Sequence, residues 1–119
     1  MTIKDELLVL RAINTKSILF SFMKNMSKWE LLLTIADLNG SPEYGIWNYI
    51  EMINTKTENP MTLYAFLKLK IDEGSLLITK SEKKSRKSLI LSEELRMELN
   101  IFMLMRKTPQ LPEVTNITI

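Results

Sequence analysis

The residues best suited to chemistry in this 119-residue chain are basic side chains that gather between positions 59 and 91. That segment holds seven basic and three acidic residues, a net charge of +4, whereas the whole chain carries only +2. Clustered lysine and arginine are the first sign of a nucleic-acid-binding surface. The sequence therefore predicts that this segment binds phosphate groups. Its basic residues are Lys68, Lys70, Lys80, Lys83, Lys84, Arg86 and Lys87.

Two residue types needed for most other chemistry are missing, because the chain contains neither cysteine nor histidine. It therefore has no thiol nucleophile, no disulfide and no cysteine-based zinc site. It also lacks the commonest general base and metal ligand. The carboxylates show no pairing at a spacing that suggests acid–base catalysis. We interpret the protein as a non-enzyme, with no catalytic residue, no metal site and no cofactor.

The composition is that of an ordinary globular domain, with 45% hydrophobic and 25% charged residues. A chain of this length can bury one hydrophobic core. Its first fourteen residues mix charged and apolar side chains, unlike a signal peptide. No apolar run approaches the ~20 residues of a membrane span. We expect a cytoplasmic protein without a membrane partner, associated with the nucleoid when bound to DNA.

A helix over residues 60–73 must position the first part of the basic segment. Asn59-Pro60 is a typical helix start, and Gly74 follows its end. Helical spacing places Leu63, Phe66 or Leu67, the Lys70 stem and Ile71 on the buried face. The open face then carries Thr62, Tyr64, Ala65 and Lys68. Two readings of Tyr64 stay open, contact with DNA bases or packing against the preceding helix, and Met61 is interpreted as a filler of the core.

Two short apolar runs, Leu76–Thr79 and Leu89–Leu91, enclose a polar loop and predict a β-hairpin. The basic side chains of Lys83, Lys84, Arg86 and Lys87 lie at its tip. Such a tip suits phosphates or a narrow minor groove. The alternatives are a merely solvated basic turn and a nuclear localisation signal.

Two further helices are predicted before this unit. Ser27-Lys28-Trp29-Glu30 has the pattern of a capping box, and Asn39-Gly40 that of a left-handed helix end. Ser41-Pro42 then predicts the start of a helix that runs to about Asn54. With the helix at 60–73, these segments predict a compact three-helix core.

The terminal segments hold more apolar residues than one small core requires. Residues 1–25 predict one helix or two after a cap at Thr2, and Ser92 caps a last helix over 92–107. We expect both to form a dimer interface, although they could instead only cover their own domain. The predicted interface residues are Leu7, Leu10, Ile18, Leu95, Leu99, Phe102 and Met103. Residues 108–119 are predicted to be an extended or disordered tail.

The order of these elements resembles a known family over residues 27–98: the MarR-type winged helix-turn-helix of small bacterial and archaeal regulators. The similarity is carried by the helix pair Pro42–Glu73 and by Ile71–Leu77, which is similar to the family's leucine–acid–acid–x–glycine–leucine–valine sequence. The basic stretch Lys84–Ser92 resembles the family's wing tip and returning strand. Ser75 stands where the family usually has glycine, and the usual aspartate-glycine of the tip is replaced by lysine and serine.

The resemblance implies a mainly α fold with a small β-hairpin. Residues 1–107 would form one domain, with a dimerisation segment at 1–25, a winged-helix core at 26–91 and a second dimerisation helix at 92–107. The chain is shorter than a typical family member, so no small-molecule effector is predicted.

The function that the resemblance implies is sequence-specific binding of double-stranded DNA by a homodimer, as in a transcriptional regulator. The helix at 60–73 would read the major groove, and the wing at 80–88 would contact phosphates or the minor groove. A two-fold dimer would read a near-palindrome whose half-sites lie ~34 Å apart. The alternatives are a plasmid or phage replication or partition factor, and a winged helix used only to bind proteins.

Overall fold

The computed structural model describes residues 2–79 and 86–107. The predicted tail at 108–119 and the basic residues Lys80, Lys83 and Lys84 lie outside the described residues. The elements follow the order α1 (Ile3–Arg11), α2 (Ile18–Met23), α3 (Met26–Leu38), α4 (Ile46–Met52), α5 (Pro60–Asp72), β1 (Leu76–Ile78), β2 (Leu89–Leu91) and α6 (Glu93–Lys107). The prediction of a mainly helical chain with a small hairpin is thus confirmed.

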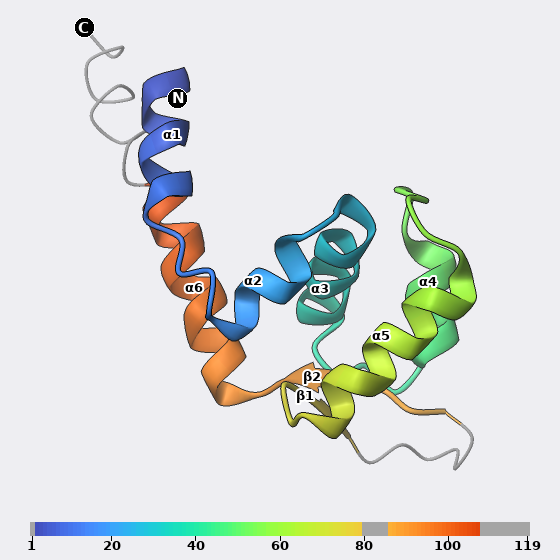
Figure 1. Ribbon diagram of the computed structural model, residues 1–119. Helices are drawn as coiled ribbons and strands as arrows, with labels where there is room; N and C mark the ends of the chain where they lie inside the picture. The colour runs from blue at the N-terminus through green and yellow to red at the C-terminus, as the bar shows by residue number, and fades with distance from the viewer. Residues whose placement is uncertain (1, 80–85, 108–119) are drawn as a thin grey trace, which may run out of the picture.

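The elements form a body and an arm (Figure 1). The body contains α2 to α5 and the hairpin, whose strands pair antiparallel with Leu77 opposite Ile90. The arm consists of α1 packed on the far part of α6, where Arg106 binds Glu6 at 2.7 Å. Within the described ranges, no helix is both long and apolar enough to cross a membrane.

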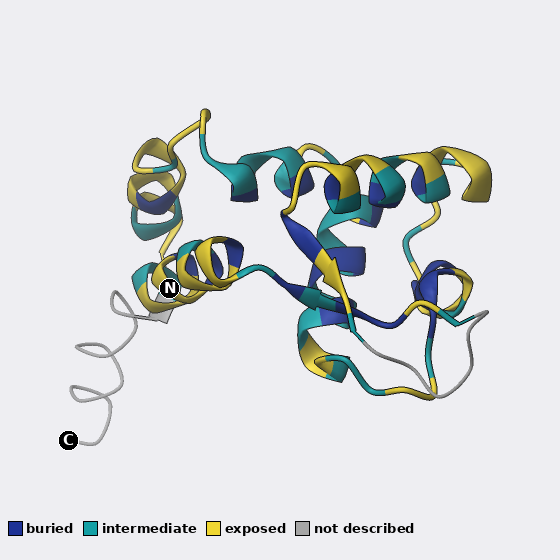
Figure 2. Cartoon of the chain, turned by 90° about the horizontal axis from the view of Figure 1, so that it is seen from below, coloured by how far each residue is buried: buried dark blue, intermediate teal, exposed yellow. Residues whose placement is uncertain are grey.

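One hydrophobic core joins both parts (Figure 2). The largest fully buried side chains come from the helices of the body and the hairpin, and α6 adds Leu95. Tyr49 of α4 is among them, and its hydroxyl accepts a hydrogen bond from the Leu89 backbone N–H at 2.9 Å. Burial raises the pKa of Tyr49, so this hydroxyl stays neutral. The bond fixes α4 against the hairpin.

The limits of α5 agree with the prediction from its sequence. The Asn59 side chain accepts a bond from the Thr62 N–H, and Pro60 occupies the first turn. Gly74 follows the helix with φ of 84°, a left-handed conformation that glycine adopts without strain. Leu63, Leu67 and Lys70 are buried, as expected for the inner face.

The predicted capping box at Ser27 is wrong, because Asn25 caps α3 instead. The Ser27 hydroxyl donates to the Thr55 carbonyl at 2.6 Å and accepts from the Thr57 N–H. The Glu30 carboxylate accepts from the N–H groups of Asn54 and Thr55. Both side chains therefore hold the turn before α5 rather than the start of their own helix.

The helix predicted to start at Ser41-Pro42 begins only at Ile46. Residues 42–45 instead lie along the returning limb of the hairpin, where the buried Ser88 hydroxyl donates to the Tyr44 carbonyl at 2.6 Å. This contact ties the segment to the hairpin. Gly45 then forms the N-cap of α4, and its N–H donates to the Asn48 side chain.

The other helix ends follow their local signals. Asn39 and Gly40 both have positive φ at the end of α3. The N-terminal segment forms two helices, and Thr2 caps the first in a capping box with Asp5. The Ser92 hydroxyl accepts a bond from the Leu95 N–H at the start of α6.

Candidate nucleic-acid interface

The open face of α5 carries most of the side chains expected there. Thr62 and Ala65 are exposed, and Lys68 is half-buried. Met61 is 64% exposed, so its interpretation as a filler is wrong. Leu69 is 52% exposed on the same helix, although the sequence analysis did not select it. It comes four residues after Ala65, and that spacing could have identified it.

Tyr64 packs against the preceding helix, which was one of its two expected roles. Its ring stacks on Trp47 of α4, with the centroids 4.7 Å apart and the planes 7° from parallel. Trp47 nevertheless stays 44% exposed. The sequence analysis did not select this tryptophan.

Part of the basic loop lies on the same side of the molecule as the stacked rings of Trp47 and Tyr64. Arg86 donates to the Pro42 carbonyl at 3.3 Å, and Lys87 is exposed. Lys83 and Lys84 lie outside the described residues. The structure thus brings Arg86 and Lys87 close to Tyr64, whereas more than twenty positions separate them in the chain.

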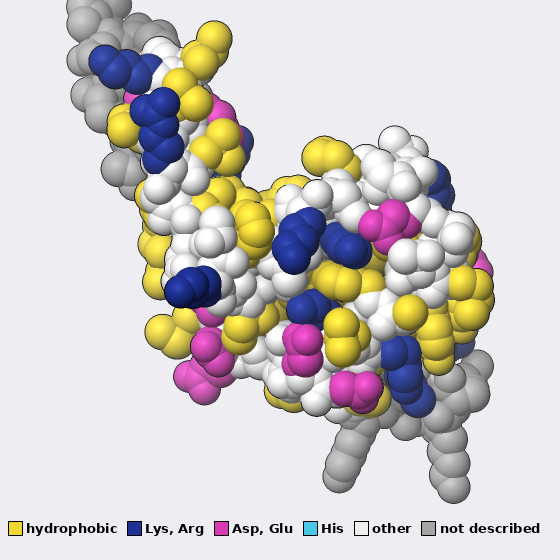
Figure 3. Space-filling view, in the orientation of Figure 1, with side chains coloured by type: hydrophobic (Ala, Val, Ile, Leu, Met, Phe, Trp, Pro, Cys, Tyr) yellow, Lys and Arg dark blue, Asp and Glu magenta, His cyan; other side chains and the backbone are white. Residues whose placement is uncertain are grey.

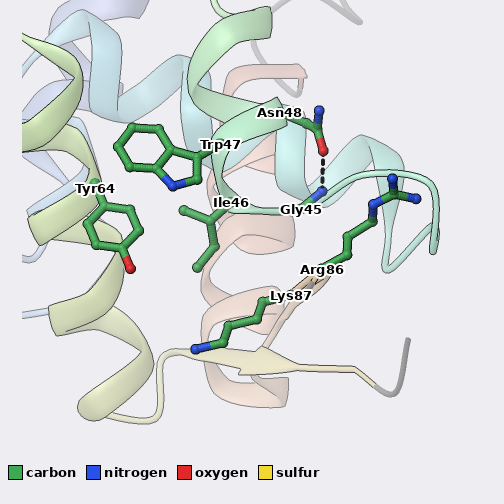
Figure 4. A pocket seen from close by; sticks show the side chains of 7 residues that line it. All are labelled: Gly45, Ile46, Trp47, Asn48, Tyr64, Arg86 and Lys87. Carbon is green, nitrogen blue, oxygen red and sulfur yellow. Dashed lines mark hydrogen bonds between the residues drawn. The ribbon is translucent and has the colours of Figure 1, made fainter. Parts of the chain in front are cut away.

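These side chains surround an open hollow of about 350 Å³, referred to below as the α4–α5–hairpin hollow (Figure 4). Asn48 shapes its rim by accepting a bond from the Gly45 N–H at 2.8 Å. Of the residues that the structure describes, two cationic ones line the hollow and no acidic one does. The lining residues are Gly45, Ile46, Trp47, Asn48, Tyr64, Arg86 and Lys87.

Lys70 belongs to the same basic segment in sequence but not to this surface. It is only 7% exposed, and its ammonium group binds Glu73 at 3.0 Å. The ammonium also lies over the Phe66 ring, 5.4 Å from its centroid. Its charge is therefore neutralised within the body.

The turn that leads into α5 is held by charged groups as well as by neutral hydrogen bonds. The N–H of Thr55, and next to it that of Asn54, stabilise the charged form of Glu30 and lower its pKa. On the other side of the turn, Lys28 binds Glu58 at 3.5 Å. The start of α5 is thus anchored to α3 through the turn.

The predicted dimer residues separate into two groups. Leu95, Leu99 and Phe102 are buried within the single chain, so they cannot also contact a second copy in this conformation. They form the side of α6 that faces the body, where Phe102 meets the Trp29 ring edge-on at 5.6 Å. The others are at least partly exposed, namely Leu7, Leu10, Ile18 and Met103.

The arm exposes further apolar side chains that the sequence analysis did not select. They include Ile3, Leu8, Met97 and Ile101. Figure 3 shows hydrophobic side chains along the arm and at its junction with the body. A groove at this junction, of about 490 Å³, is lined by Leu10, Trp29 and Met103 among others.

Comparisons with known proteins add no family. No protein-family model matches the chain, and neither curated proteins nor solved structures match it. Function must therefore be argued from the geometry.

Proposed function

We propose that this protein is a homodimeric, sequence-specific DNA-binding protein that regulates transcription. In this proposal the body is a winged helix-turn-helix, with α4 and α5 as the helix-turn-helix and the hairpin as the wing. The helix α5 enters the major groove, which is wide enough for an α-helix. The basic loop at 80–88 contacts the DNA backbone beside it.

The observation that carries the proposal is the hollow shared by α5 and the hairpin. Tyr64 and Lys87 line it together, so the open side of α5 and the basic limb belong to one surface. A reading helix beside a phosphate-binding loop is the arrangement that positions a protein on duplex DNA.

The open face of α5 has side chains suited to base edges. Thr62 and Lys68 offer hydrogen-bond donors, which base acceptors in the major groove can receive. Met61, Ala65 and Leu69 offer apolar contact for thymine methyl groups. This mixture favours sequence recognition over purely electrostatic binding.

The turn before α5 supports the proposal mechanically. Ser27 and Glu30 of α3 bind its backbone, so the angle between α4 and α5 is set by a third helix. A helix that reads bases must keep a fixed orientation to discriminate between them.

The arm supplies the second copy. Its exposed side chains on α1 and α6 form an apolar surface that a monomer would leave in water. Two copies joined there would present two α5 helices to successive major grooves. A dimer also carries two basic segments, so the positive charge available to DNA is twice that of a single chain.

Fluorescence anisotropy with a labelled random-sequence duplex at two salt concentrations tests the proposal. The wild type is compared with a variant in which Lys83, Lys84, Arg86 and Lys87 are all alanine. We expect salt-sensitive binding by the wild type, and for the variant a log–log salt slope lower by up to about 0.9 per lost phosphate contact. Equal binding by both proteins would favour a module that binds only proteins.

A replication or partition factor would use the same surface. Sequencing of DNA fragments that the full-length protein retains from its source genome would separate the two roles. Enrichment of many promoter regions supports the regulator, and enrichment of a single replication origin contradicts it.

A further inference from the structure

Three hydrogen-bond donors at the α4–α5–hairpin hollow have no acceptor among residues 2–79 and 86–107. They are the indole N–H of Trp47, the hydroxyl of Tyr64 and the ammonium of Lys87, and none is hydrogen-bonded within residues 2–79 and 86–107. Figure 4 shows the Tyr64 hydroxyl and the Lys87 ammonium turned toward the same side of the hollow. The indole nitrogen of Trp47 lies on the edge of its ring nearer to Lys87.

The charged residues that line the hollow, among those the structure describes, are both cationic. They are Arg86 and Lys87. Arg86 already donates one hydrogen bond to the Pro42 carbonyl. It therefore adds positive charge to the hollow, but one of its donors is not available to a ligand. A ligand that satisfies this site must bring several acceptors and a negative charge, which a phosphate group does.

The stacked rings make the donors rigid. Trp47 and Tyr64 lie nearly parallel at 4.7 Å, and each comes from a different helix. The pair therefore holds an N–H and an O–H in a fixed relation while 44% of Trp47 remains open to solvent. Donors held in this way lose little conformational entropy when they bind a ligand.

From this geometry we infer that the hollow binds one phosphodiester group of the DNA backbone, next to the groove that α5 reads. Lys87 supplies the charge, and Tyr64 and Trp47 supply neutral hydrogen bonds to the phosphate oxygens. The contact fixes the depth and register of α5 and carries no sequence information itself. The inference rests on the proposed function and assigns Tyr64 to the backbone rather than to a base.

Three conservative substitutions test the site by anisotropy. Tyr64→Phe and Trp47→Phe each keep an aromatic ring and remove one donor, and Lys87→Gln removes the charge. We expect Tyr64→Phe and Trp47→Phe to weaken duplex binding about tenfold each without changing the salt slope. Lys87→Gln should weaken binding and lower the slope by about 0.9. Lys16→Gln, an exposed position between α1 and α2, is the matched control and should bind like the wild type.

The same variants distinguish a backbone contact from a base contact. Once a specific site is selected, loss of a phosphate contact weakens binding to specific and random duplexes by the same factor. Loss of a base contact weakens the specific complex alone. A selective effect of Tyr64→Phe on the specific duplex would overturn the inference. Thermal melts of each variant show whether the fold is retained.

Tryptophan fluorescence gives an independent readout, because the chain has only two tryptophans. With Trp29→Phe, Trp47 is the single emitter, and we expect duplex DNA to quench it and high salt to restore the emission. With Trp47→Phe, the remaining Trp29 should not respond. An unchanged Trp47 signal at a duplex concentration that saturates the anisotropy would overturn the inference.

The outcomes separate this inference from the proposed function. If the wild type binds no duplex at low salt, both fail. If it binds but Tyr64→Phe, Trp47→Phe and Lys87→Gln bind like the wild type, only the phosphate site fails. Quenching of Trp47 by inorganic phosphate but not by duplex would assign the hollow to a small phosphorylated molecule and also overturn the inference.

Discussion

The α4–α5–hairpin hollow and the arm both expose large hydrophobic or aromatic side chains, but with opposite surroundings. In the hollow, Trp47 lies beside two cations and beside donors that have no acceptor among the described residues. On the arm, Leu8 and Ile101 lie on helices whose one described ion pair, Glu6–Arg106, already neutralises its charges. Exposed apolar area alone therefore does not define a partner. Donors that converge on one hollow indicate a polar ligand, whereas exposed leucine and isoleucine side chains spread along two packed helices indicate another apolar surface.

The two tryptophans differ in the same way, since one belongs to the core and the other to an exposed surface. Trp29 meets Phe102 edge-on and covers the core where the arm joins the body. Trp47 stacks on Tyr64 at the edge of the body and remains partly exposed. One side chain stabilises the fold, and the other is placed to contact something outside it.

The largest expected effect tests the inner side of the arm. Leu99→Ala removes a buried side chain of α6 and should lower the free energy of unfolding by about 3 kcal/mol. Met103→Ala removes a similar volume from an exposed position and should leave unfolding of the monomer almost unchanged, measured at protein concentrations below the dimer dissociation constant. Equal destabilisation by both would show that the two sides of α6 have been confused.

The outer side of the arm is tested by Leu7→Gln, at an exposed position of α1. If this surface joins two copies, the substitution should raise the dimer dissociation constant about tenfold, because it replaces buried apolar area with an amide. Sedimentation velocity over a range of concentrations measures the change. Lys4→Gln on the same helix is the control, and a monomeric wild type would contradict the dimer.

Two lysines of the basic segment sharpen the contrast between surface and core. Lys68→Ala should weaken DNA binding several-fold with almost no shift of the thermal melt, since a half-buried lysine on the open face of α5 contributes little to stability. Lys70→Ala should lower the melt by a few degrees, because its stem packs in the body and its charge binds Glu73. Anisotropy measures the DNA affinity of both variants, and calorimetry measures their melting temperatures. A melt lowered by Lys68→Ala would mean that its face of α5 is wrongly assigned.

The smallest effect concerns the turn that orients α5. Hydrogen bonds from the turn lower the pKa of Glu30 in the folded state. The ionised carboxylate therefore stabilises the fold at pH values above 4.5, the ordinary pKa of this group. That stabilisation is lost as the pH falls through the lowered pKa. The difference in urea midpoint between wild type and Glu30→Gln should therefore be larger at pH 7 than at pH 3. A difference that does not depend on pH would exclude this role for the charge.

Much of the fold follows from local signals. The start of α5 at Asn59-Pro60 and the left-handed residues Asn39 and Gly40 were all predictable, because caps depend on side chains within a few residues of the helix end. The hairpin followed from the change in apolar spacing after Gly74. The open face of α5 followed from the helical period, apart from Met61 and Leu69.

Other features were decided by contacts between distant segments. Ser27 has the sequence signature of a cap, but Thr55 and Thr57 lie close enough to bind its hydroxyl instead. Ser88 binds the Tyr44 carbonyl in the segment where a helix was predicted, and α4 begins only at Ile46. Local sequence cannot show which of two competing partners lies nearer in the folded chain.

The sequence by itself determined the order of the helices and the hairpin, the limits of α5 and the segment that holds the positive charge. It could do so because propensity, capping and net charge depend on neighbouring residues. Only the tertiary structure decided that Lys70 is neutralised, that Leu95 and Leu99 are core residues, and that Trp47, Tyr64 and Lys87 share one hollow. Which residues are buried, and which distant residues lie together, depends on how the separate elements pack. That packing depends on the whole chain and not on any one segment.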